Sequence, residues 1–486
     1  MDLLNYIDGE WTSGPGDLVL DLNPSHPSDI VARFHNSGPE EVRAAVAAAQ
    51  RAFPMWSNTP APARGRVLAR FHQLLVDHQD QYVAIMMAEQ GKTRGEALGE
   101  FQKGVNLVEF FAGEGFRLNG ETIPSEVPNN LTYTIRVPLG VVAVITPWNF
   151  PFAIPLWKVC PALVAGNTVV FKPASYTPWV AVQLIEDLIA AGLPRGVVNL
   201  VLGPGGAAGE ALARDERIRA LSFTGSNAVG NRLAALMAGR SVKLTMEMGG
   251  KNAVVVAPSA DLDLAVAGVI QGAFGAAGQR CTATSRVFVH EEVHDTFVER
   301  LVDQARRLKV DAAEDPKTNV GPLISEDQVA LSIRYVQDAK ERGAQVQLGG
   351  DRAQAPGYFM LPTILDGVDL SMPVAHEEVF GPVLSVLTYR DAQDAIRWVN
   401  SVEYGLSAAI YTRDLAEAQH FIQAVEVGMV HVNNPTIGGE AQMPFGGIKN
   451  SGIGPREMGH EGTLFFTEVK TVFVDYSGSG RQGNFY

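Results

Sequence analysis

The chain has 486 residues, of which 46% are hydrophobic and 19% charged, a composition typical of a folded protein large enough for about three domains. Its formal net charge of -14 would repel phosphate backbones, so nucleic-acid binding is not expected. The two cysteines, Cys160 and Cys281, are too few for a disulfide framework and are typical of a reducing compartment.

The first segment of the chain carries neither a basic run nor an apolar run, so a secretory signal is not expected and the cytoplasm is the predicted location. Further on, Ser37, Gly38 and Pro39 form the kind of capped start that precedes a helix. We expect an alanine-rich helix from there towards Phe53.

Short runs of β-branched residues alternate with amphipathic segments from about residue 140, a pattern that predicts an α/β fold with parallel strands. One helix is expected over Pro178–Ala191, where Val180, Leu184 and Leu188 share a face. The expected strands are Val141–Ile145, Thr168–Phe171, Val197–Leu202, Ala220–Phe223, Ala253–Val256 and Ser285–Val289.

The most apolar stretch, Val141–Gly166, is long enough to span a bilayer. It contains several prolines together with Asn149 and Lys158, which a membrane helix would rarely tolerate. A buried strand, turn and helix is therefore expected there, and no membrane span.

Two motifs have the wrong context for their usual functions. Gly203–Gly209 lies between a strand and a helix, but the acidic residue of a dinucleotide fingerprint is missing about 20 positions later, so we expect only a tight turn. His290 and His294 match H-E-x-x-H, yet His290 closes a strand and the helix is expected from Glu291. No metal site is predicted, because that motif requires both histidines on one helix.

Three residues could carry covalent chemistry. Cys281 lies in a polar, glycine-containing segment between a helix and a strand, an accessible setting for a nucleophile, whereas Cys160 lies in an apolar helix and is interpreted as packing. Glu247 is followed by two glycines before a strand, which suits a general base. Asn149 follows the strand Val141–Ile145, and its amide could donate to an oxyanion, an interaction worth ~10²–10³ in rate.

The chain resembles the aldehyde dehydrogenase superfamily over essentially its whole length. The segments that carry the resemblance, in the family's order and spacing, are Pro147–Pro151, Phe171–Ser175, Phe223–Gly230, Glu247–Asn252, Gly278–Cys281, Glu377–Pro382 and Pro444–Gly454. The resemblance implies the α/β aldehyde dehydrogenase fold, divided into a Rossmann-like cofactor domain (1–125 and 141–247), an α/β catalytic domain (248–445), and a small β oligomerisation arm with the C-terminal segment (126–140 and 446–486). The small residues Ser477–Gly480 suggest a flexible or partner-draped end.

The resemblance also implies the roles of the catalytic residues. Cys281 would attack the aldehyde, with the oxyanion held by Asn149 and the Cys281 backbone N–H, and Glu247 would activate the water that hydrolyses the thioester to a carboxylate. Relatives that pass the acyl group to coenzyme A generally lack that glutamate. Lys158 and Glu457 match a proton path behind the base, although a plain ion pair is an equal alternative.

The implied cofactor is NAD or NADP. Lys172 and Glu378 resemble the two ribose-binding positions, and Phe380 would lie against the nicotinamide. Ser175 stands where relatives selective for NAD often carry a glutamate, which would repel a 2′-phosphate, so NADP is expected to be accepted. The remaining cofactor-binding positions, including the family's pyrophosphate site at the start of a helix, are Thr146, Pro147, Trp148, Phe223, Gly225, Ser226 and Gly230.

For the substrate, the segments around Cys281 and Glu247 resemble the branch that acts on 2-oxoglutarate semialdehyde (2,5-dioxopentanoate). Arg280 could bind the far carboxylate, or it could point outward or pair with a nearby acid. Phe150 and Thr282 are the other expected substrate contacts, and Glu440 would disfavour an anion if it faced inward.

Several alternatives remain open from sequence. They are a succinate-semialdehyde or broad-range aliphatic or aromatic aldehyde dehydrogenase, a plain thiol hydrolase, and a non-catalytic protein that keeps the fold. The resemblance also implies a homodimer or homotetramer, formed by pairing Asn130–Val137 and Lys470–Tyr476 across subunits. No partner other than the small aldehyde and the second subunit is expected.

Overall fold

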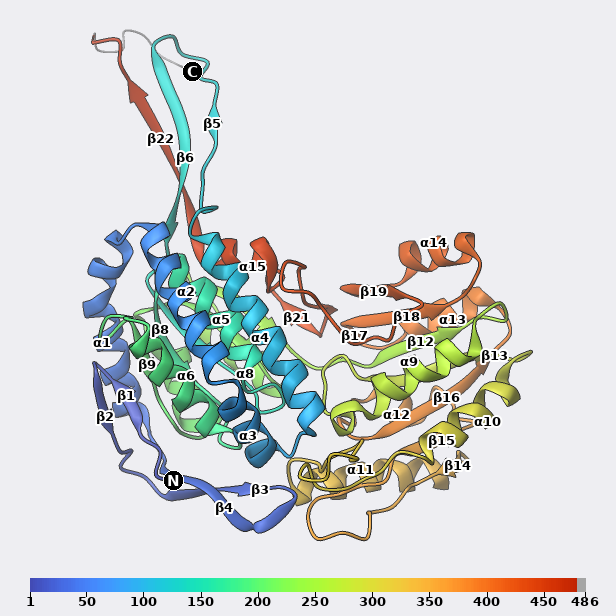
Figure 1. Cartoon of the computed structure of the whole chain (residues 1–486). Helices are drawn as coiled ribbons and strands as arrows, with labels where there is room; N and C mark the ends of the chain where they lie inside the picture. The colour runs from blue at the N-terminus through green and yellow to red at the C-terminus, as the bar shows by residue number, and fades with distance from the viewer. Residues whose placement is uncertain (479–486) are drawn as a thin grey trace.

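The computed structural model describes residues 1–478, which form two lobes and a projecting arm (Figure 1). Of the predicted tail, Ser479 and Gly480 lie outside the described residues, as do residues 481–486 of the predicted C-terminal segment. The fold is the expected mixed α/β one, and no helix among the described residues is long and apolar enough to cross a membrane.

An eight-stranded sheet forms the centre of the first lobe. Its five middle strands are parallel, and β1, β2 and β21 extend it antiparallel at the edges. In spatial order the strands are β2 (Glu10–Thr12), β1 (Asn5–Ile7), β9 (Val198–Leu200), β8 (Thr168–Lys172), β7 (Val141–Ile145), β10 (Ile218–Thr224), β11 (Lys243–Glu247) and β21 (Gly452–Ile453). Because the chain order reverses on either side of β7, a crevice is expected outside the carboxyl ends of β7 and β10.

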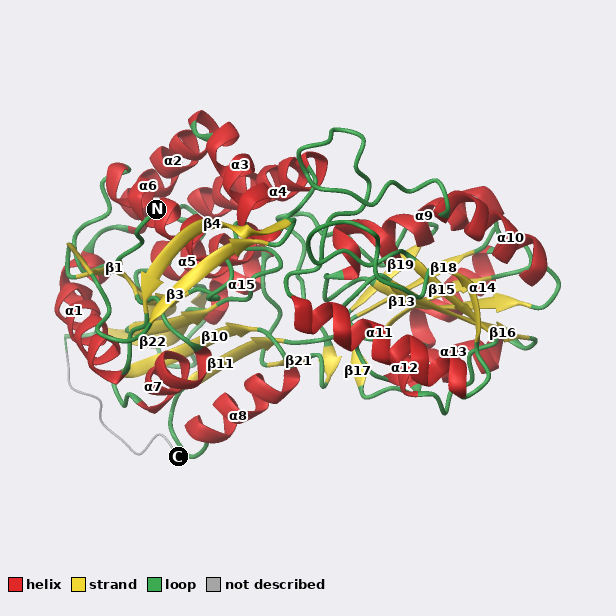
Figure 2. Cartoon of the chain, turned by 90° about the horizontal axis from the view of Figure 1, so that it is seen from below, coloured by secondary structure: helices red, strands yellow, loops and turns green. Residues whose placement is uncertain are grey.

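Helices cover both faces of this sheet (Figure 2). All residues of β7 and β8 are buried, as expected for parallel strands covered on both sides. The helices are α1 (Pro39–Asn58), α2 (Ala61–Asp77), α3 (Gln79–Gln90), α4 (Arg94–Glu114), α5 (Ala153–Val164), α6 (Pro178–Ala190), the π-helical turn η1 (Gly205–Gly209), α7 (Glu210–Arg214), α8 (Asn227–Met237) and α15 (Gly459–Phe465).

The predicted helix after Gly38 is confirmed but is longer than expected. Its first turn is closed by the Glu41 carboxylate, which accepts from the Gly38 N–H at 2.8 Å. Beyond Phe53 the helix continues through Pro54 to Asn58, because a proline near the C-terminus of a helix removes only one backbone bond. The Asn58 amide donates to the Pro54 carbonyl at 2.8 Å and closes the last turn.

A seven-stranded sheet forms the centre of the second lobe, parallel except for the edge strand β14. In spatial order the strands are β14 (Gln345–Leu348), β15 (Thr363–Asp366), β16 (Val383–Tyr389), β13 (Thr284–His290), β12 (Asn252–Val256), β18 (Ser407–Tyr411) and β19 (Met429–Val432). The helices around it are α9 (Leu262–Phe274), the 3₁₀ turn η2 (Gly275–Gly278), α10 (His294–Ala305), α11 (Glu326–Glu341), α12 (Pro373–His376), α13 (Ala392–Asn400) and α14 (Leu415–Ala424). Each lobe has its own buried apolar core.

The arm is a three-stranded sheet of β22 (Thr467–Asp475), β6 (Asn130–Pro138) and β5 (Thr122–Ile123). The two segments expected to take part in pairing across subunits also pair with each other within one chain, in antiparallel register from Thr467 opposite Pro138 to Asp475 opposite Asn130. The arm is thus complete within a single chain, a long-range pairing that the alternation of apolar residues does not specify. Two small ribbons, β3 (Leu18–Asn23) with β4 (His26–His35) and β17 (Tyr404–Gly405) with β20 (Ile448–Lys449), complete the fold.

Candidate active site

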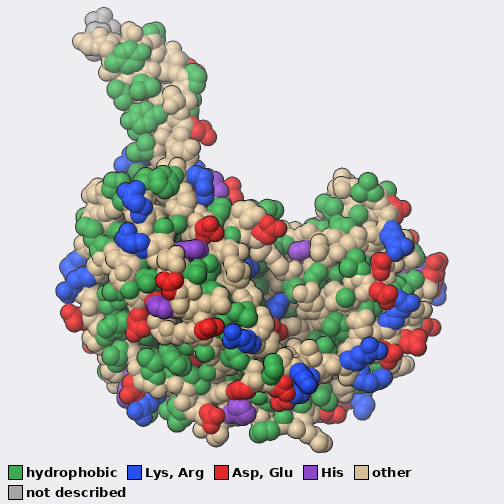
Figure 3. Space-filling model, in the orientation of Figure 1, with side chains coloured by type: hydrophobic (Ala, Val, Ile, Leu, Met, Phe, Trp, Pro, Cys, Tyr) green, Lys and Arg blue, Asp and Glu red, His purple; other side chains and the backbone are tan. Residues whose placement is uncertain are grey.

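The candidate site lies between the two lobes, where the surface is hollowed (Figure 3). Residues from both lobes meet there. Glu378, from the second lobe, accepts a hydrogen bond from the Gly250 N–H at 3.1 Å, and Phe380 packs edge-on against Trp148 of the first lobe, with ring centroids 5.6 Å apart.

The loop that carries Cys281 is held by hydrogen bonds to its backbone. Asn252, at the start of β12, donates to the carbonyls of Cys281 and Ala283 at 2.8 and 2.9 Å. The Gln279 side chain accepts from the Ile324 N–H at 2.9 Å. Such a network fixes the position of the thiol, as a nucleophile requires.

The turn just before this loop is strained. Ala276 and Ala277, within η2, both have a φ of 52°, in the left-handed region that non-glycine residues rarely adopt. The Glu96 carboxylate accepts from the Ala276 N–H at 2.5 Å and so stabilises this conformation from helix α4.

Asn149 lies beside the nucleophile loop, as predicted. It follows β7, is buried, and its amide nitrogen donates to the Gln279 carbonyl at 3.0 Å. An amide nitrogen has two hydrogens, so one hydrogen holds the loop and the other is available to a developing oxyanion.

Glu247 ends β11, as predicted for a residue at a strand-loop junction. Its Oε2 atom is buried without a hydrogen-bond partner among the described residues. Burial raises its pKa well above the ordinary value, Glu457 raises it further, and Lys158 lowers it. A raised pKa makes the carboxylate a stronger base than an ordinary one, which suits a residue that abstracts a proton.

The Cys281 thiol has a raised pKa. Burial is the main cause, the charges of Glu247 and Glu378 add to it, and Lys103 opposes it, giving a pKa of about 12. Both carboxylates are therefore within electrostatic reach of the sulfur. A nearby base must take the thiol proton at neutral pH, because the thiolate is the nucleophile.

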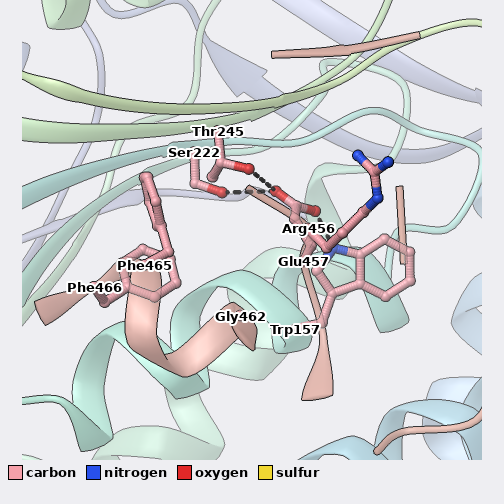
Figure 4. A pocket seen from close by; sticks show the side chains of 8 residues that line it. All are labelled: Trp157, Ser222, Thr245, Arg456, Glu457, Gly462, Phe465 and Phe466. Carbon is pink, nitrogen blue, oxygen red and sulfur yellow. Dashed lines mark hydrogen bonds between the residues drawn. The ribbon is translucent and has the colours of Figure 1, made fainter. Parts of the chain in front are cut away.

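Lys158 and Glu457 form the buried ion pair expected behind the base. The Glu457 carboxylate also accepts from the Trp157 indole at 2.8 Å and from the Ser222 hydroxyl at 3.1 Å, and Figure 4 shows it between these groups and Thr245. The pair is connected to β10 and β11 through hydroxyl groups, so the geometry is compatible with both a proton path and a purely structural ion pair.

The predicted adenosine-side residues meet at the carbonyl of Gly203. The Lys172 ammonium donates to it at 3.0 Å and the Ser175 hydroxyl at 3.4 Å. Gly203 begins the turn that precedes η1, so this turn lies beside Lys172 and Ser175 as expected. Burial lowers the pKa of Lys172 to about 8.

The remaining cofactor positions follow the carboxyl ends of β7 and β10. Thr146 and Thr224 have buried hydroxyls without hydrogen-bond partners among the described residues, and Ser226 begins α8 without a side-chain cap. Orphaned polar atoms and free N–H groups at a helix start fit a bound pyrophosphate and ribose. Pro147 and Trp148 follow Thr146 directly. Phe223, Gly225 and Gly230 are closely packed, because a Cβ on either glycine would lie within 2.6 Å of a neighbouring side chain.

The predicted substrate residues lie in or beside the loop that carries Cys281. Phe150 lies 5.7 Å from the Arg280 guanidinium, and Thr282 is buried next to Cys281. Among residues 1–478 Arg280 forms no ion pair with an acid. Burial lowers its pKa, and the nearby charges of Glu96 and Glu100 raise it. Glu440 is exposed and accepts from Gln442.

Five further residues at this site were missed by sequence reasoning: Lys92, Glu100, Lys103, Trp157 and Phe445. Lys92 forms a buried ion pair with Glu100 and donates to the Asn149 carbonyl at 2.7 Å, while Glu100 also accepts from the N–H groups that begin α5. Lys92, Glu100, Lys103 and Trp157 lie in no motif, and Phe445 lies in the segment Pro444–Gly454 without a predicted role, because the contacts of these residues come from tertiary packing.

The H-E-x-x-H motif has no metal-binding geometry. His290 ends β13 and His294 begins α10, three residues later than the predicted helix start, because Glu291 to Val293 form a turn. Within residues 1–478 no cluster of three or more His, Cys, Asp or Glu side chains could hold a metal ion.

Comparison with known proteins places these observations in a family. Residues 11–472 match the aldehyde dehydrogenase family. The chain is 41% identical to a 2,5-dioxopentanoate dehydrogenase of Saccharolobus solfataricus, over 96% of this chain and 98% of the relative. It is 39% identical to the NADP-dependent succinate-semialdehyde dehydrogenase of Escherichia coli, over 96% and 97%. A crystal structure of betaine aldehyde dehydrogenase from Staphylococcus aureus in complex with NAD is also similar, with a TM-score of 0.95 and 32% identity over 98% of this chain and 95% of that one.

Proposed function

The chain belongs to the aldehyde dehydrogenase family, and we propose that it oxidises 2,5-dioxopentanoate or a closely related carboxylate-bearing semialdehyde to the dicarboxylate. The enzyme is an NAD(P)-dependent aldehyde dehydrogenase with a catalytic cysteine. The observation that carries the proposed mechanism is that Cys281 and Asn149, on two loops held by hydrogen bonds, and Glu247, at the end of β11, meet at one cleft.

In the proposed reaction, Glu247 accepts the thiol proton and the Cys281 sulfur attacks the aldehyde carbon. The free hydrogen of the Asn149 amide and the Cys281 backbone N–H then hold the oxyanion. The bound NAD(P) supplies the acceptor for the hydride that leaves this carbon, which converts the adduct to a thioester on Cys281.

Hydrolysis completes the cycle. Once the thiol proton has left Glu247 through the pair of Lys158 and Glu457, Glu247 takes a proton from a water molecule. The resulting hydroxide adds to the thioester carbon, and the C–S bond breaks to release the carboxylate and the Cys281 thiolate. The ion pair of Lys158 with Glu457 lies behind Glu247. The charge of Glu457 raises the pKa of Glu247, and the charge of Lys158 lowers it. We propose that this pair passes the collected proton away from the base.

The substrate proposal is supported by a relative and by the charge of the site. The relative named for 2,5-dioxopentanoate covers nearly all of both chains. Arg280 lies beside the thiol without an ion-pair partner among the described residues, so an anionic substrate would meet a cation. Succinate semialdehyde is a second candidate, since a relative named for it is almost as similar.

We also propose that NADP is used at least as well as NAD. A serine at position 175 removes the repulsion that a glutamate would exert on a 2′-phosphate, and the Lys172 ammonium beside it supplies positive charge. We propose as well that residues 1–125 and 141–247 form the cofactor-binding domain and residues 248–445 the catalytic domain.

The arm supports a homodimer or homotetramer. Its exposed apolar side chains include Leu131, Ile135, Val469 and Phe473, and Figure 3 shows hydrophobic side chains gathered along it. We propose that β22, which lies at the edge of the arm sheet, pairs with another subunit. The two free cysteines fit a reducing location such as the cytoplasm.

Reduction of NAD and of NADP, followed by absorbance, tests the proposal with 2,5-dioxopentanoate, succinate semialdehyde, pentanal and benzaldehyde as substrates. The expected result is the highest kcat/KM with a semialdehyde that carries a carboxylate, and substantial activity with NADP. Equal or higher kcat/KM with pentanal or benzaldehyde would contradict the substrate proposal, and a negligible rate with NADP would contradict the cofactor proposal.

A further inference from the structure

Lys103 lies in the middle of α4, where it lines a groove between α4 and residues 439–442, and its charge acts on the Cys281 thiol. Its ammonium lies 5.0 Å from the centroid of the Trp157 ring and 5.5 Å from that of Phe445. It also lies 3.7 Å from where a Cβ on Gly439 would be. The ammonium that α4 carries therefore lies beside Trp157 of α5 and beside the loop 433–445.

This ammonium has no hydrogen bond or ion pair within residues 1–478, although the side chain is largely covered. Burial lowers its pKa to about 8, while the nearby Cys281 and Glu100 raise it. The neighbouring Lys92 is the contrast, because it has both the Glu100 carboxylate and the Asn149 carbonyl as partners. A covered cation without a counterion is costly, so its retention beside a catalytic thiol indicates a ligand that provides the counterion.

The ring faces position this cation without neutralising it. Trp157 is itself fixed, since its indole donates to Glu457 at 2.8 Å, and its ring packs against Phe445 with centroids 5.3 Å apart. Such a cation-π arrangement stabilises an ammonium while leaving its hydrogens free to donate.

The two cations next to the thiol differ in their surroundings. Lys103 lines an open groove of about 870 Å³ formed by α4 and residues 439–442. Arg280 does not line that groove. Burial lowers the pKa of Arg280, and the charges of Glu96 and Glu100 raise it. The groove is also lined by Glu109 and Glu440, and Lys103 is the cation among its described lining residues. An anionic group that enters from the groove therefore meets Lys103 before Arg280.

We propose that Lys103 binds the anionic end of the substrate while the aldehyde carbon lies at Cys281. This inference rests on the proposed function, since it names the residue that selects carboxylate-bearing aldehydes in that same site. It makes Lys103 a specificity-determining residue and gives Trp157 and Phe445 the part of positioning it.

The test compares succinate semialdehyde with butanal, which has the same chain length but no charge. Lys103→Met is expected to lower kcat/KM for succinate semialdehyde by about 10- to 100-fold, chiefly through KM, as for loss of one charge-assisted hydrogen bond. For butanal the change should stay below about threefold. Lys103→Arg should recover part of the loss, and the exposed Lys340→Met serves as the matched loss of a positive charge far from the cleft.

Three results would overturn the inference. An equal loss for both aldehydes would mean that Lys103 acts on the thiol or on folding, which the melting temperature and the alkylation rate of Cys281 would then separate. An unchanged preference in Lys103→Met together with its loss in Arg280→Met would assign the anion to Arg280. If the wild-type enzyme itself prefers butanal, both the substrate proposal and this inference fail, whereas a wild-type preference that survives in Lys103→Met overturns the inference alone.

Discussion

The nucleophile side and the groove side of the cleft hold their important side chains in different ways. Around Cys281, amide groups from Asn149 and Asn252 bond directly to loop carbonyls at 2.8 to 3.0 Å. Around Lys103, the contacts are the faces of Trp157 and Phe445. The first arrangement fixes a reacting atom, whereas the second leaves hydrogen-bond donors open to a ligand. Exchanges on the nucleophile side should therefore abolish turnover, and exchanges on the groove side should change which aldehyde is used.

The largest effect is expected for Cys281→Ala, on the nucleophile side. Loss of the nucleophile should lower kcat for every aldehyde by on the order of 10⁴ or more, measured as reduced nicotinamide formed. Cys160→Ala removes the other thiol, which is fully buried in α5, and should keep nearly all activity. A Cys281→Ala enzyme that retains a substantial part of the wild-type kcat would refute the assignment of the nucleophile.

Asn149→Ala tests the oxyanion donor on the same side. The expected loss is ~10²–10³ in kcat with little change in KM, because the amide acts on charge that develops in the transition state. The loop also loses a bond to Gln279, so alkylation of Cys281 by iodoacetamide is the control for its position. An unchanged kcat would show that the oxyanion is held elsewhere.

A third region, the adenosine side of the cofactor site, sharpens the comparison. Ser175→Glu places a carboxylate beside Lys172, so kcat/KM for NADP should fall by about 10- to 100-fold through repulsion of the 2′-phosphate. The value for NAD should be kept or improved. Ser175→Gln, of similar size but uncharged, is the matched control. Parallel losses with both cofactors would show that position 175 does not face the 2′ position.

The smallest expected effect is a pH dependence confined to the groove side. The protonated Lys103 binds the anion and its pKa is about 8, so kcat/KM for succinate semialdehyde should fall several-fold above pH 8 relative to butanal. Glu100 on the same helix, and Arg280 and Cys281 on the neighbouring loop, act on this charge, and Glu109 and Glu440 line the groove. Taking the ratio of the two aldehydes removes the titration of Cys281, which affects both. Lys103→Arg should flatten the ratio, because a guanidinium stays protonated, and a ratio that is flat already in the wild type would contradict the prediction.

Much of the nucleophile side could be predicted because its residues lie at strand ends. The β-branched strands are readable from their pattern, and Thr146, Asn149 and Glu247 follow or end such strands, so their position in one cleft follows from the parallel sheet. The boundaries were less accurate, as α10 begins at His294 and β9 covers only Val198–Leu200, since turns and pairing partners decide where regular structure ends.

The groove side could not be predicted in this way. Lys103 lies in the helix α4 without any motif, and Trp157 belongs to an apolar helix that the sequence predicts to be core. Their meeting depends on how α4 packs against α5 and the loop that contains Phe445, which is a tertiary property. The same holds for the arm, where Asn130–Pro138 and Thr467–Asp475 are separated by more than half the chain.

The most direct test of the central claim is mass spectrometry of Glu247→Gln enzyme after reaction with 2,5-dioxopentanoate and NADP. Acylation should be slower in this variant, because Glu247 also takes the thiol proton, but the thioester that forms cannot be hydrolysed. We therefore expect up to one equivalent of reduced cofactor, formed more slowly than in the wild-type enzyme, no further turnover, and the acyl group on the peptide that contains Cys281. Reduced cofactor formed with no acyl group on Cys281, or with the acyl group on another residue, would contradict the proposed roles of Cys281 and Glu247.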